Sequence, residues 1–136
     1  MAGVELDQLY TALAEYSQSY LGGRLLEVTD NFDLALSWRL NQTFENATEQ
    51  GCYFLCDERA VLYIGKASMG SSIGARVSSH FVWNGSELRS SNPSWKTTPP
   101  YLRSVVVSKP WEAASLEEFL TYNLNPPFNV AGRSKW

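Results

Sequence analysis

The chain has 136 residues, of which 44% are apolar and 13% aromatic, and its formal net charge is −3. That length suits one compact domain, and the apolar share is large enough for a hydrophobic core. The sequence holds no run of about 18 apolar residues, which excludes a membrane-spanning helix. The first ten residues are acidic and polar, unlike a secretory signal, so we expect a cytoplasmic location.

The first part of the chain has the residue spacing of helices. Apolar residues recur every three or four positions over residues 4–21, and Gly22 and Gly23 end the pattern. A second helix is predicted from residue 29 or 30 to residue 40, where the alternation of apolar residues also fits a strand. Residues 1–49 are therefore predicted to be a helical extension. Its first helix either packs on the rest of the chain or pairs two copies of the chain into a homo-oligomer.

The remaining residues predict a domain over 50–131 and a short C-terminal tail over 132–136. Residues 51–56 and 61–65 are β-prone runs joined by a polar turn, which is typical of a β-hairpin. We expect a helix over 71–83, a loop over 84–100, a third strand over 101–108 and a helix over 112–124, followed by an extended segment after two prolines. The predicted fold class is α+β: a small three-stranded antiparallel β-sheet flanked by helices.

Cys52 and Cys56 are the two cysteines of the chain, and both lie in the first β-prone run. In a strand their Cα atoms would be about 13 Å apart, at a rise of about 3.3 Å per residue. A disulfide needs a separation below about 7 Å, so the two cannot pair with each other. A zinc site lacks partners, because the chain has one histidine and no third cysteine. Both residues are predicted to be buried free thiols.

The charge is divided unevenly along the chain. Residues 1–50 carry eight acids and two bases, a net charge of −6, whereas residues 59–109 carry seven bases and one acid, a net charge of +6. A basic middle segment is compatible with phosphate binding at one face, although ordinary scatter of surface charge also produces such a pattern. The acidic N-terminal segment is a candidate shield for that basic face.

Side chains that can act on a phosphate gather in the predicted domain. Tyr53 and Tyr63 fall on adjacent strands of the hairpin, and a tyrosine hydroxyl exchanges a proton or holds a phosphate oxygen. Gly65 follows at a point where the backbone could pass close to a ligand. Arg76 and His80 are four residues apart and are expected on one face of a helix.

An acidic side chain borders the buried face of the last predicted helix. Leu116, Leu120 and Leu124 set the buried direction of that helix. At about 100° per residue, Glu117 falls at the edge of this stripe, whereas Glu118 points away from it. A carboxylate at such a border is expected to be half-buried and aimed into a cleft.

Each of these side chains also has an ordinary structural interpretation. Paired tyrosines on strands usually pack, an arginine and a histidine on a helix are usually solvated, and Glu118 could form a capping box with Ser115. Three aromatic residues near the 84–100 loop either stack on bases or pack in the core: Trp83, Trp95 and Tyr101.

Short motifs follow one another in a fixed order along residues 51–129. Gly51-Cys52-Tyr53 is followed by Tyr63-Ile64-Gly65-Lys66-Ala67 and then by Arg76 and His80. Leu116-Glu117 is followed by Asn125-Pro126 and Asn129. This order resembles the signature of the GIY-YIG nuclease superfamily, including its glutamate motif and its terminal asparagine. Cys52 stands where the family usually has isoleucine or valine, and the link from Gly65 to Arg76 is longer than usual.

The resemblance implies an endonuclease that hydrolyses DNA phosphodiester bonds with one divalent cation, Mg²⁺ or Mn²⁺, bound by Glu117. It implies that Arg76 stabilises the transition state and that Tyr53 activates the attacking water, while Tyr63 and His80 hold phosphate or relay the proton. Magnesium prefers oxygen ligands and keeps several waters, which is compatible with one carboxylate.

DNA is the expected partner. Four residues are predicted to bind the substrate or support its binding: Lys66, Arg89, Lys96 and Asn129. Asn129 is expected to orient a tyrosine or the glutamate rather than to touch DNA. Substrate choice would come from the 84–100 loop, the N-terminal segment or oligomerisation. The alternative function is a catalytically silent GIY-YIG-like module that binds nucleic acid or a protein.

Overall fold

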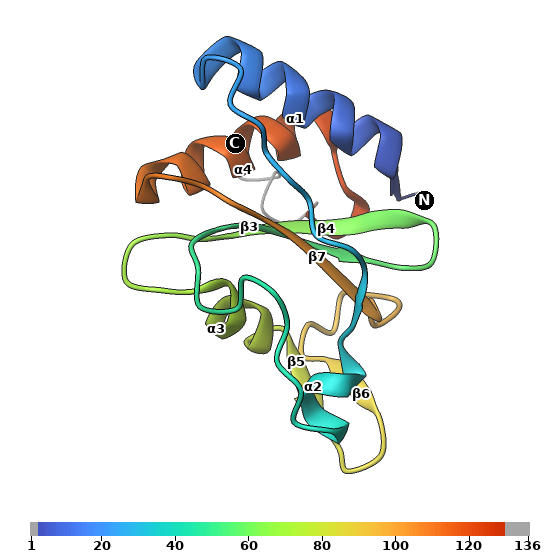
Figure 1. Cartoon of the computed structure of the whole chain (residues 1–136). Helices are drawn as coiled ribbons and strands as arrows, with labels where there is room; N and C mark the ends of the chain where they lie inside the picture. The colour runs from blue at the N-terminus through green and yellow to red at the C-terminus, as the bar shows by residue number, and fades with distance from the viewer. Residues whose placement is uncertain (1–2, 130–136) are drawn as a thin grey trace.

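A five-stranded antiparallel sheet forms the centre of the computed structural model, which describes residues 3–129 (Figure 1). Its strands are β1 Val4–Glu5, β2 Phe32–Asp33, β3 Gly51–Cys56, β4 Ala60–Ala67 and β7 Tyr101–Val106, in the spatial order β1-β4-β3-β7-β2. A separate hairpin consists of β5 Phe81–Trp83 and β6 Leu88–Ser90. The helices are α1 Leu6–Tyr20, α2 Ala35–Arg39, α3 Ile73–Ser78 and α4 Pro110–Leu124, and a 3-10 turn, η1, spans Pro127–Asn129. The predicted tail over 132–136 lies outside the described residues.

The prediction of an α+β fold is confirmed, but the prediction of three strands is wrong. The three predicted strands are the three central ones, β4, β3 and β7. The two further strands come from the N-terminal segment, where Val4 pairs with Val61 on one edge and Phe32 pairs with Leu102 on the other. A two-residue strand is too short to show a repeating apolar pattern, so only its pairing with a distant strand identifies it.

Two layers cover the two faces of the sheet. Figure 1 shows α1 and α4 on one side and α3, α2 and the β5–β6 hairpin on the other. Alternate residues of β3 divide between these layers, since Phe54 belongs to the α1–α4 core and Tyr53 to the opposite one. All six residues of β3 are buried, as expected for a central strand with both faces covered.

The predicted N-terminal helix is confirmed as α1. Leu9, Leu13 and Tyr16 are its buried face, and it packs against α4. The backbone N–H of Glu5 donates to the Gln8 side chain at 3.0 Å, which helps to cap the helix start. Gly22 follows the helix end with a φ of +65°, a conformation that favours glycine. Among the described helices, none combines the length and the apolar composition needed to cross a membrane.

The helix predicted from residue 29 or 30 to residue 40 is mostly wrong. Its first part is extended and forms β2, and only five residues after Leu34 are helical. The Asp33 carboxylate accepts a hydrogen bond from the Ala35 N–H at 3.1 Å, which favours a helix start at that point. The strand that the alternation of apolar residues also allowed is thus present in the first part of the segment, as β2, and the helix is present only in the second part.

The helix predicted over 71–83 ends early, at Ser78. Ser72 caps its start, because its side chain accepts from the Ala75 N–H at 3.2 Å. The next apolar residues form β5, which pairs with β6 inside the predicted 84–100 loop. A β-branched and aromatic run such as Phe81–Trp83 suits a strand, and the partner strand makes that preference decisive.

The last predicted helix is confirmed as α4, which begins two residues earlier than expected, with Pro110 at its first turn. The Glu112 carboxylate accepts from the N–H groups of Ser108 and Lys109, each at 3.0 Å, and so caps the helix. Ser115 lies in the middle of α4, so the capping box proposed for it with Glu118 is wrong. The segment predicted as extended after the prolines is the 3-10 turn η1 as far as Asn129.

Both cysteines are buried and free, as predicted. The Cys52 thiol donates to the carbonyl oxygen of Ala113 at 3.4 Å, and the Cys56 thiol donates to that of Phe54 at 3.4 Å. Burial raises the pKa of both thiols, that of Cys56 to about 12, so neither is a thiolate at neutral pH.

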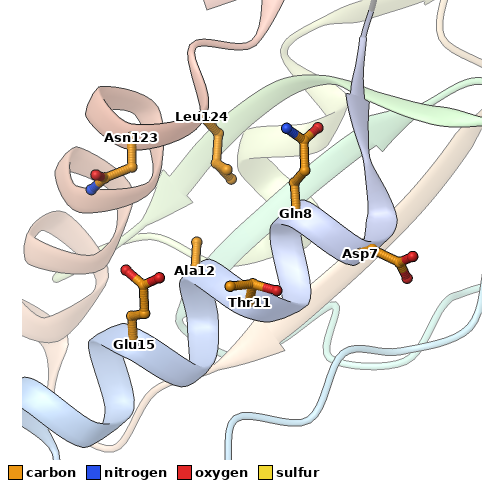
Figure 2. Close-up of a pocket in the computed structure, with 7 residues that line it drawn as sticks. All are labelled: Asp7, Gln8, Thr11, Ala12, Glu15, Asn123 and Leu124. Atoms are coloured by element: carbon orange, nitrogen blue, oxygen red, sulfur yellow. The ribbon is translucent and has the colours of Figure 1, made fainter.

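A surface cavity of about 360 Å³ lies between α1 and the end of α4 (Figure 2). Polar side chains border it, and the charged ones, Asp7 and Glu15, are both acidic. It lies in the layer that α1 and α4 form, on the face of the sheet opposite Tyr53. Its acidic border is unsuited to a phosphate group.

Candidate active site

Tyr53 and Tyr63 lie on one face of the sheet, on the adjacent strands β3 and β4. Tyr63 is opposite Leu55, and residues opposite each other in antiparallel strands share a face. Tyr53 is two residues from Leu55 on β3, so it lies on that same face. The ring centroids of the two tyrosines are 6.3 Å apart. Tyr53 is fully buried, whereas Tyr63 is partly exposed. Tyr63 is therefore the tyrosine of this pair that reaches solvent.

Gly65 makes room for the ring of Tyr53. The two residues are opposite each other in the β3–β4 pair. A β-carbon on residue 65 would lie 2.3 Å from Cζ and 2.4 Å from the hydroxyl oxygen of Tyr53. The close approach expected at this glycine is thus made by a side chain of the protein itself.

His80 joins the tyrosines from the segment that follows α3. Its Nε2 and the Tyr53 hydroxyl share a hydrogen bond of 2.8 Å, and its ring centroid is 4.9 Å from that of Tyr63. Because α3 ends at Ser78, the expectation that Arg76 and His80 share a helix face is wrong. Burial and then the Arg76 charge lower the pKa of His80 to about 4, so the imidazole is neutral at pH 7.

Arg76 supplies a positive charge next to this group. It lies on α3 and is exposed, and it makes no salt bridge with any described residue. Its charge lowers the pKa of Tyr53, of Tyr63 and of Glu117. The guanidinium therefore acts electrostatically on all three side chains.

The N-terminal segment holds the helix that carries Arg76. The Ile73 N–H donates to the carbonyl of Glu49 at 2.9 Å, and the Gly74 N–H donates to that of Ala47 at 2.8 Å. A β-carbon on residue 74 would lie 2.9 Å from the Ala47 oxygen, so glycine permits this approach. The first turn of α3, whose N–H groups lack partners within the helix, is thus bound by residues outside it.

Burial raises the pKa of both tyrosines. For Tyr53 the Tyr63 side chain raises it further and Arg76 opposes the shift, whereas for Tyr63 the Glu117 charge raises it and Arg76 opposes it. The Tyr53 hydroxyl also lowers the pKa of Tyr63, the direction expected when a hydroxyl faces the phenolic oxygen. Both are neutral phenols at pH 7.

Glu117 reaches the group from α4. It is half-buried, whereas Glu118 is exposed, which agrees with the helical geometry expected from the sequence. Burial raises the pKa of the Glu117 carboxyl, Lys66 and Arg76 lower it, and Glu118 raises it. The carboxylate forms no salt bridge with any residue in the described part of the chain. Its negative charge is therefore only partly compensated by the protein.

The predicted substrate-binding residues fall in different places. Asn129 bonds to both backbone groups of Ile64: its Oδ1 accepts from the N–H and its Nδ2 donates to the carbonyl, each at 2.9 Å. It thereby holds β4 at the residue after Tyr63. Lys66 is half-buried on β4, and Lys96 is exposed. Arg89 lies on β6, where it forms an exposed salt bridge of 2.6 Å with Glu87.

Two aromatic residues complete the group and were not predicted as site residues. Trp95 is stacked on His80 at 5.4 Å and on Phe128 at 5.1 Å, and its ring centroid is 5.1 Å from that of Tyr63. It is 8% exposed, so of the two alternatives for Trp95, packing is confirmed and stacking on bases is wrong. The available signal was a tryptophan in a polar segment, which by itself does not indicate its partners.

Residues 49–130 match the UvrC-like GIY-YIG domain family. The chain belongs to this family. The match covers more than half of the chain and includes β3, β4, α3, β7, α4 and η1. The sequence matched none of the curated proteins with which it was compared.

GIY-YIG domains are typically nucleases, which implies DNA as the partner, and they generally use a divalent metal. Across residues 3–129, no three or more histidine, cysteine, aspartate or glutamate side chains form a cluster that could hold a metal ion. Glu117, half-buried and without an ion pair in the described residues, fits a cation that takes one carboxylate and keeps its other oxygen ligands as water.

Proposed function

We propose that the protein is a metal-dependent endonuclease that hydrolyses phosphodiester bonds of DNA. The observation that supports this function best is the arrangement around β4: Arg76, Glu117 and the Tyr53–His80 pair come from α3, α4, β3 and the turn that follows α3. The Arg76 guanidinium and the Glu117 carboxylate lie beside the neutral phenols of Tyr53 and Tyr63 and the neutral imidazole of His80. This combination suits hydrolysis at an anionic centre.

Glu117 is proposed as the ligand of the divalent cation, Mg²⁺ or Mn²⁺. When bound, the cation supplies positive charge that stabilises the leaving oxygen of the phosphodiester. Burial disfavours the ionised carboxylate, so a cation beside it relieves an unfavourable charge. Glu118 is exposed on the same helix and has no such role in this proposal.

Arg76 is proposed to stabilise the additional negative charge of the transition state. Its guanidinium is exposed and forms no salt bridge with the described residues, so it is available to form two hydrogen bonds with phosphate oxygens. Lys66 adds a second positive charge near Glu117. Lys96 and Arg89 are proposed to contact DNA outside the reacting group.

The attacking water is proposed to contact Tyr63, and Tyr53 is proposed to accept the proton from Tyr63. The family resemblance implies water activation by Tyr53, but the full burial of Tyr53 favours Tyr63 for direct contact with the water. As the water attacks phosphorus, its proton passes to Tyr63, the Tyr63 proton to Tyr53, and the Tyr53 proton to Nε2 of His80. The hydrogen bond between Tyr53 and His80 supports the last transfer, for which Nε2 is the unprotonated nitrogen of the imidazole.

Cleavage of supercoiled plasmid DNA tests this function. We expect the full chain to nick or linearise the plasmid in the presence of Mg²⁺ or Mn²⁺ and not in the presence of EDTA. Glu117→Ala should abolish cleavage, whereas Glu118→Ala, a change of the same size on the exposed side of α4, should retain it. Plasmid, linear and branched DNA that all stay intact with the wild-type protein would favour the silent binding module instead.

A further inference from the structure

Trp95 connects the 84–100 segment with the tyrosine–histidine group. Its neighbours in sequence are exposed, yet its own side chain is buried. The indole lies between His80 and Phe128, with an interplanar angle of 21° on each side, and is tilted by 49° against Tyr63. Trp95 therefore contacts two residues of the proposed proton path, Tyr63 and His80.

His80 depends on this segment for its position. It lies two residues beyond the end of α3, and its N–H donates to the Val77 carbonyl of that helix at 3.1 Å. The 84–100 segment binds the other side of this turn: the Ser91 N–H donates to the His80 carbonyl at 2.8 Å, and the Ser91 hydroxyl donates to the Ser79 carbonyl at 3.1 Å. The ring is held by the hydrogen bond to Tyr53 and by the stacked indole.

Phe128 extends the stack to the end of the described chain. It lies next to Asn129, whose two hydrogen bonds attach η1 to Ile64 of β4. The aromatic residues Phe128, Trp95, His80 and Tyr53 thus form a continuous series from η1 to β3. The hydrogen bonds between Asn129 and Ile64 attach the Phe128 end of this series to β4, the strand of Tyr63. Displacing one ring of the series would loosen the next.

We propose that Trp95 is the positioning residue of the active site, which holds the His80 imidazole against the Tyr53 hydroxyl. The indole covers one face of the imidazole, so that the ring keeps the orientation in which Nε2 meets Tyr53. The importance of that orientation for catalysis rests on the proposed function, while the positioning itself is a property of the folded protein. Trp95 contacts no substrate atom in this proposal.

The environment of the imidazole makes the proposal measurable. The titratable groups that face His80 are Tyr53 from β3, Tyr63 from β4 and Arg76 from α3. Burial is the largest reason that the pKa of His80 is low, and the stacked indole contributes to that burial. Without the indole, water reaches the ring, and the pKa of His80 rises toward its ordinary value of 6.5.

A pH titration of His80 by NMR tests the proposal, because His80 is the only histidine of the chain and its ring signals are unambiguous. In Trp95→Ala we expect the pKa of His80 to rise by about one unit or more. Trp95→Phe keeps one aromatic ring on the imidazole and should stay closer to the wild-type value. Trp111→Ala, which removes a tryptophan that is 65% exposed on α4, should leave the titration unchanged.

A folded Trp95→Ala protein in which His80 titrates as in the wild type would overturn the proposal. Should the alanine variant not fold, Trp95→Leu and Trp95→Phe carry the test, and an unchanged titration in a folded form of either would overturn it. For cleavage, we expect Trp95→Ala to lower kcat at least about tenfold with a smaller change in KM. The titration needs no DNA, so absence of cleavage by the wild-type protein would reject the proposed function and leave the positioning of His80 testable.

Discussion

Tyr53 and Gly65 fit together only because residue 65 has no side chain: a β-carbon there would lie 2.3 Å from Cζ of the tyrosine. The two residues are opposite each other on β3 and β4. Tyr53 in turn meets His80 through its hydroxyl. The glycine of β4 therefore leaves the space that the ring and hydroxyl of Tyr53 occupy.

Gly65→Ala should force the Tyr53 ring out of position and destabilise the protein by about 1–3 kcal/mol, the usual cost of adding a methyl group to a packed site. Urea unfolding measures the free energy. The control is the same change in a Tyr53→Leu background, where the atoms that the methyl group would meet, Cζ, Cε2 and the hydroxyl, are gone. The cost should be smaller there, and equal costs in both backgrounds would contradict the proposed clash.

Asn129→Ala should remove both hydrogen bonds to Ile64 and leave its backbone groups without those partners. We expect a loss of about 1–3 kcal/mol in the free energy of unfolding, because unsatisfied buried polar groups are costly. Asn123→Ala is the matched control, since Asn123 is exposed on α4. Equal effects of the two substitutions in urea unfolding would show that the hydrogen bonds between Asn129 and Ile64 contribute nothing to the free energy of unfolding.

Glu117→Gln should make the metal-free protein more stable at pH 7. Burial raises the pKa of Glu117 above its ordinary value of 4.5, so the folded state favours the protonated form. The stabilising contribution is present below pH 4.5 and is lost as the pH rises through the folded-state pKa, which leaves a destabilising ionised group at pH 7.

Urea unfolding with EDTA at several pH values measures this effect. The advantage of the Glu117→Gln protein should shrink as the pH falls and vanish below 4.5. Glu118→Gln, an identical change at an exposed position of the same helix, is the control. A Glu117→Gln protein that is less stable than the wild type at pH 7 would be inconsistent with an uncompensated buried charge.

Deletion of residues 1–49 should destabilise the domain rather than increase its affinity for DNA. The deletion removes β1 and β2 from the two edges of the sheet and the carbonyls of Ala47 and Glu49 from the start of α3. Circular dichroism and urea unfolding measure the outcome. A stably folded fragment that binds DNA more tightly than the full chain would instead support the idea that the acidic segment shields the basic face.

A milder change addresses the same contact without removing any element. Gly74→Ala adds a methyl group 2.9 Å from the Ala47 oxygen and should weaken the attachment of α3 to the N-terminal segment. If that attachment positions Arg76, cleavage should fall while Mn²⁺ binding, measured by calorimetry, stays the same. Unchanged cleavage would show that the contact between Gly74 and Ala47 does not determine the position of Arg76.

The sequence by itself determined the elements whose patterns are local. The β-prone run at residues 51–56 predicted β3 with its observed bounds, and helical periodicity predicted α1 and the outward direction of Glu118 on α4. These features depend on which face of a single element is buried, and the spacing of apolar residues records that directly. The order of the motifs along residues 51–129 likewise identified the family that the match to residues 49–130 confirms.

Only the tertiary structure decided the features that depend on contacts between distant residues. β1 and β2 are strands because they pair with β4 and β7 at the edges of the sheet. Residues 81–83 form the strand β5, and not the end of the predicted helix, because they pair with β6. Trp95 became part of the site in the same way, through rings contributed by β4, η1 and the end of the α3 segment. Such contacts follow from how the chain packs as a whole, and a two-residue strand or a lone tryptophan leaves no repeating pattern in the sequence.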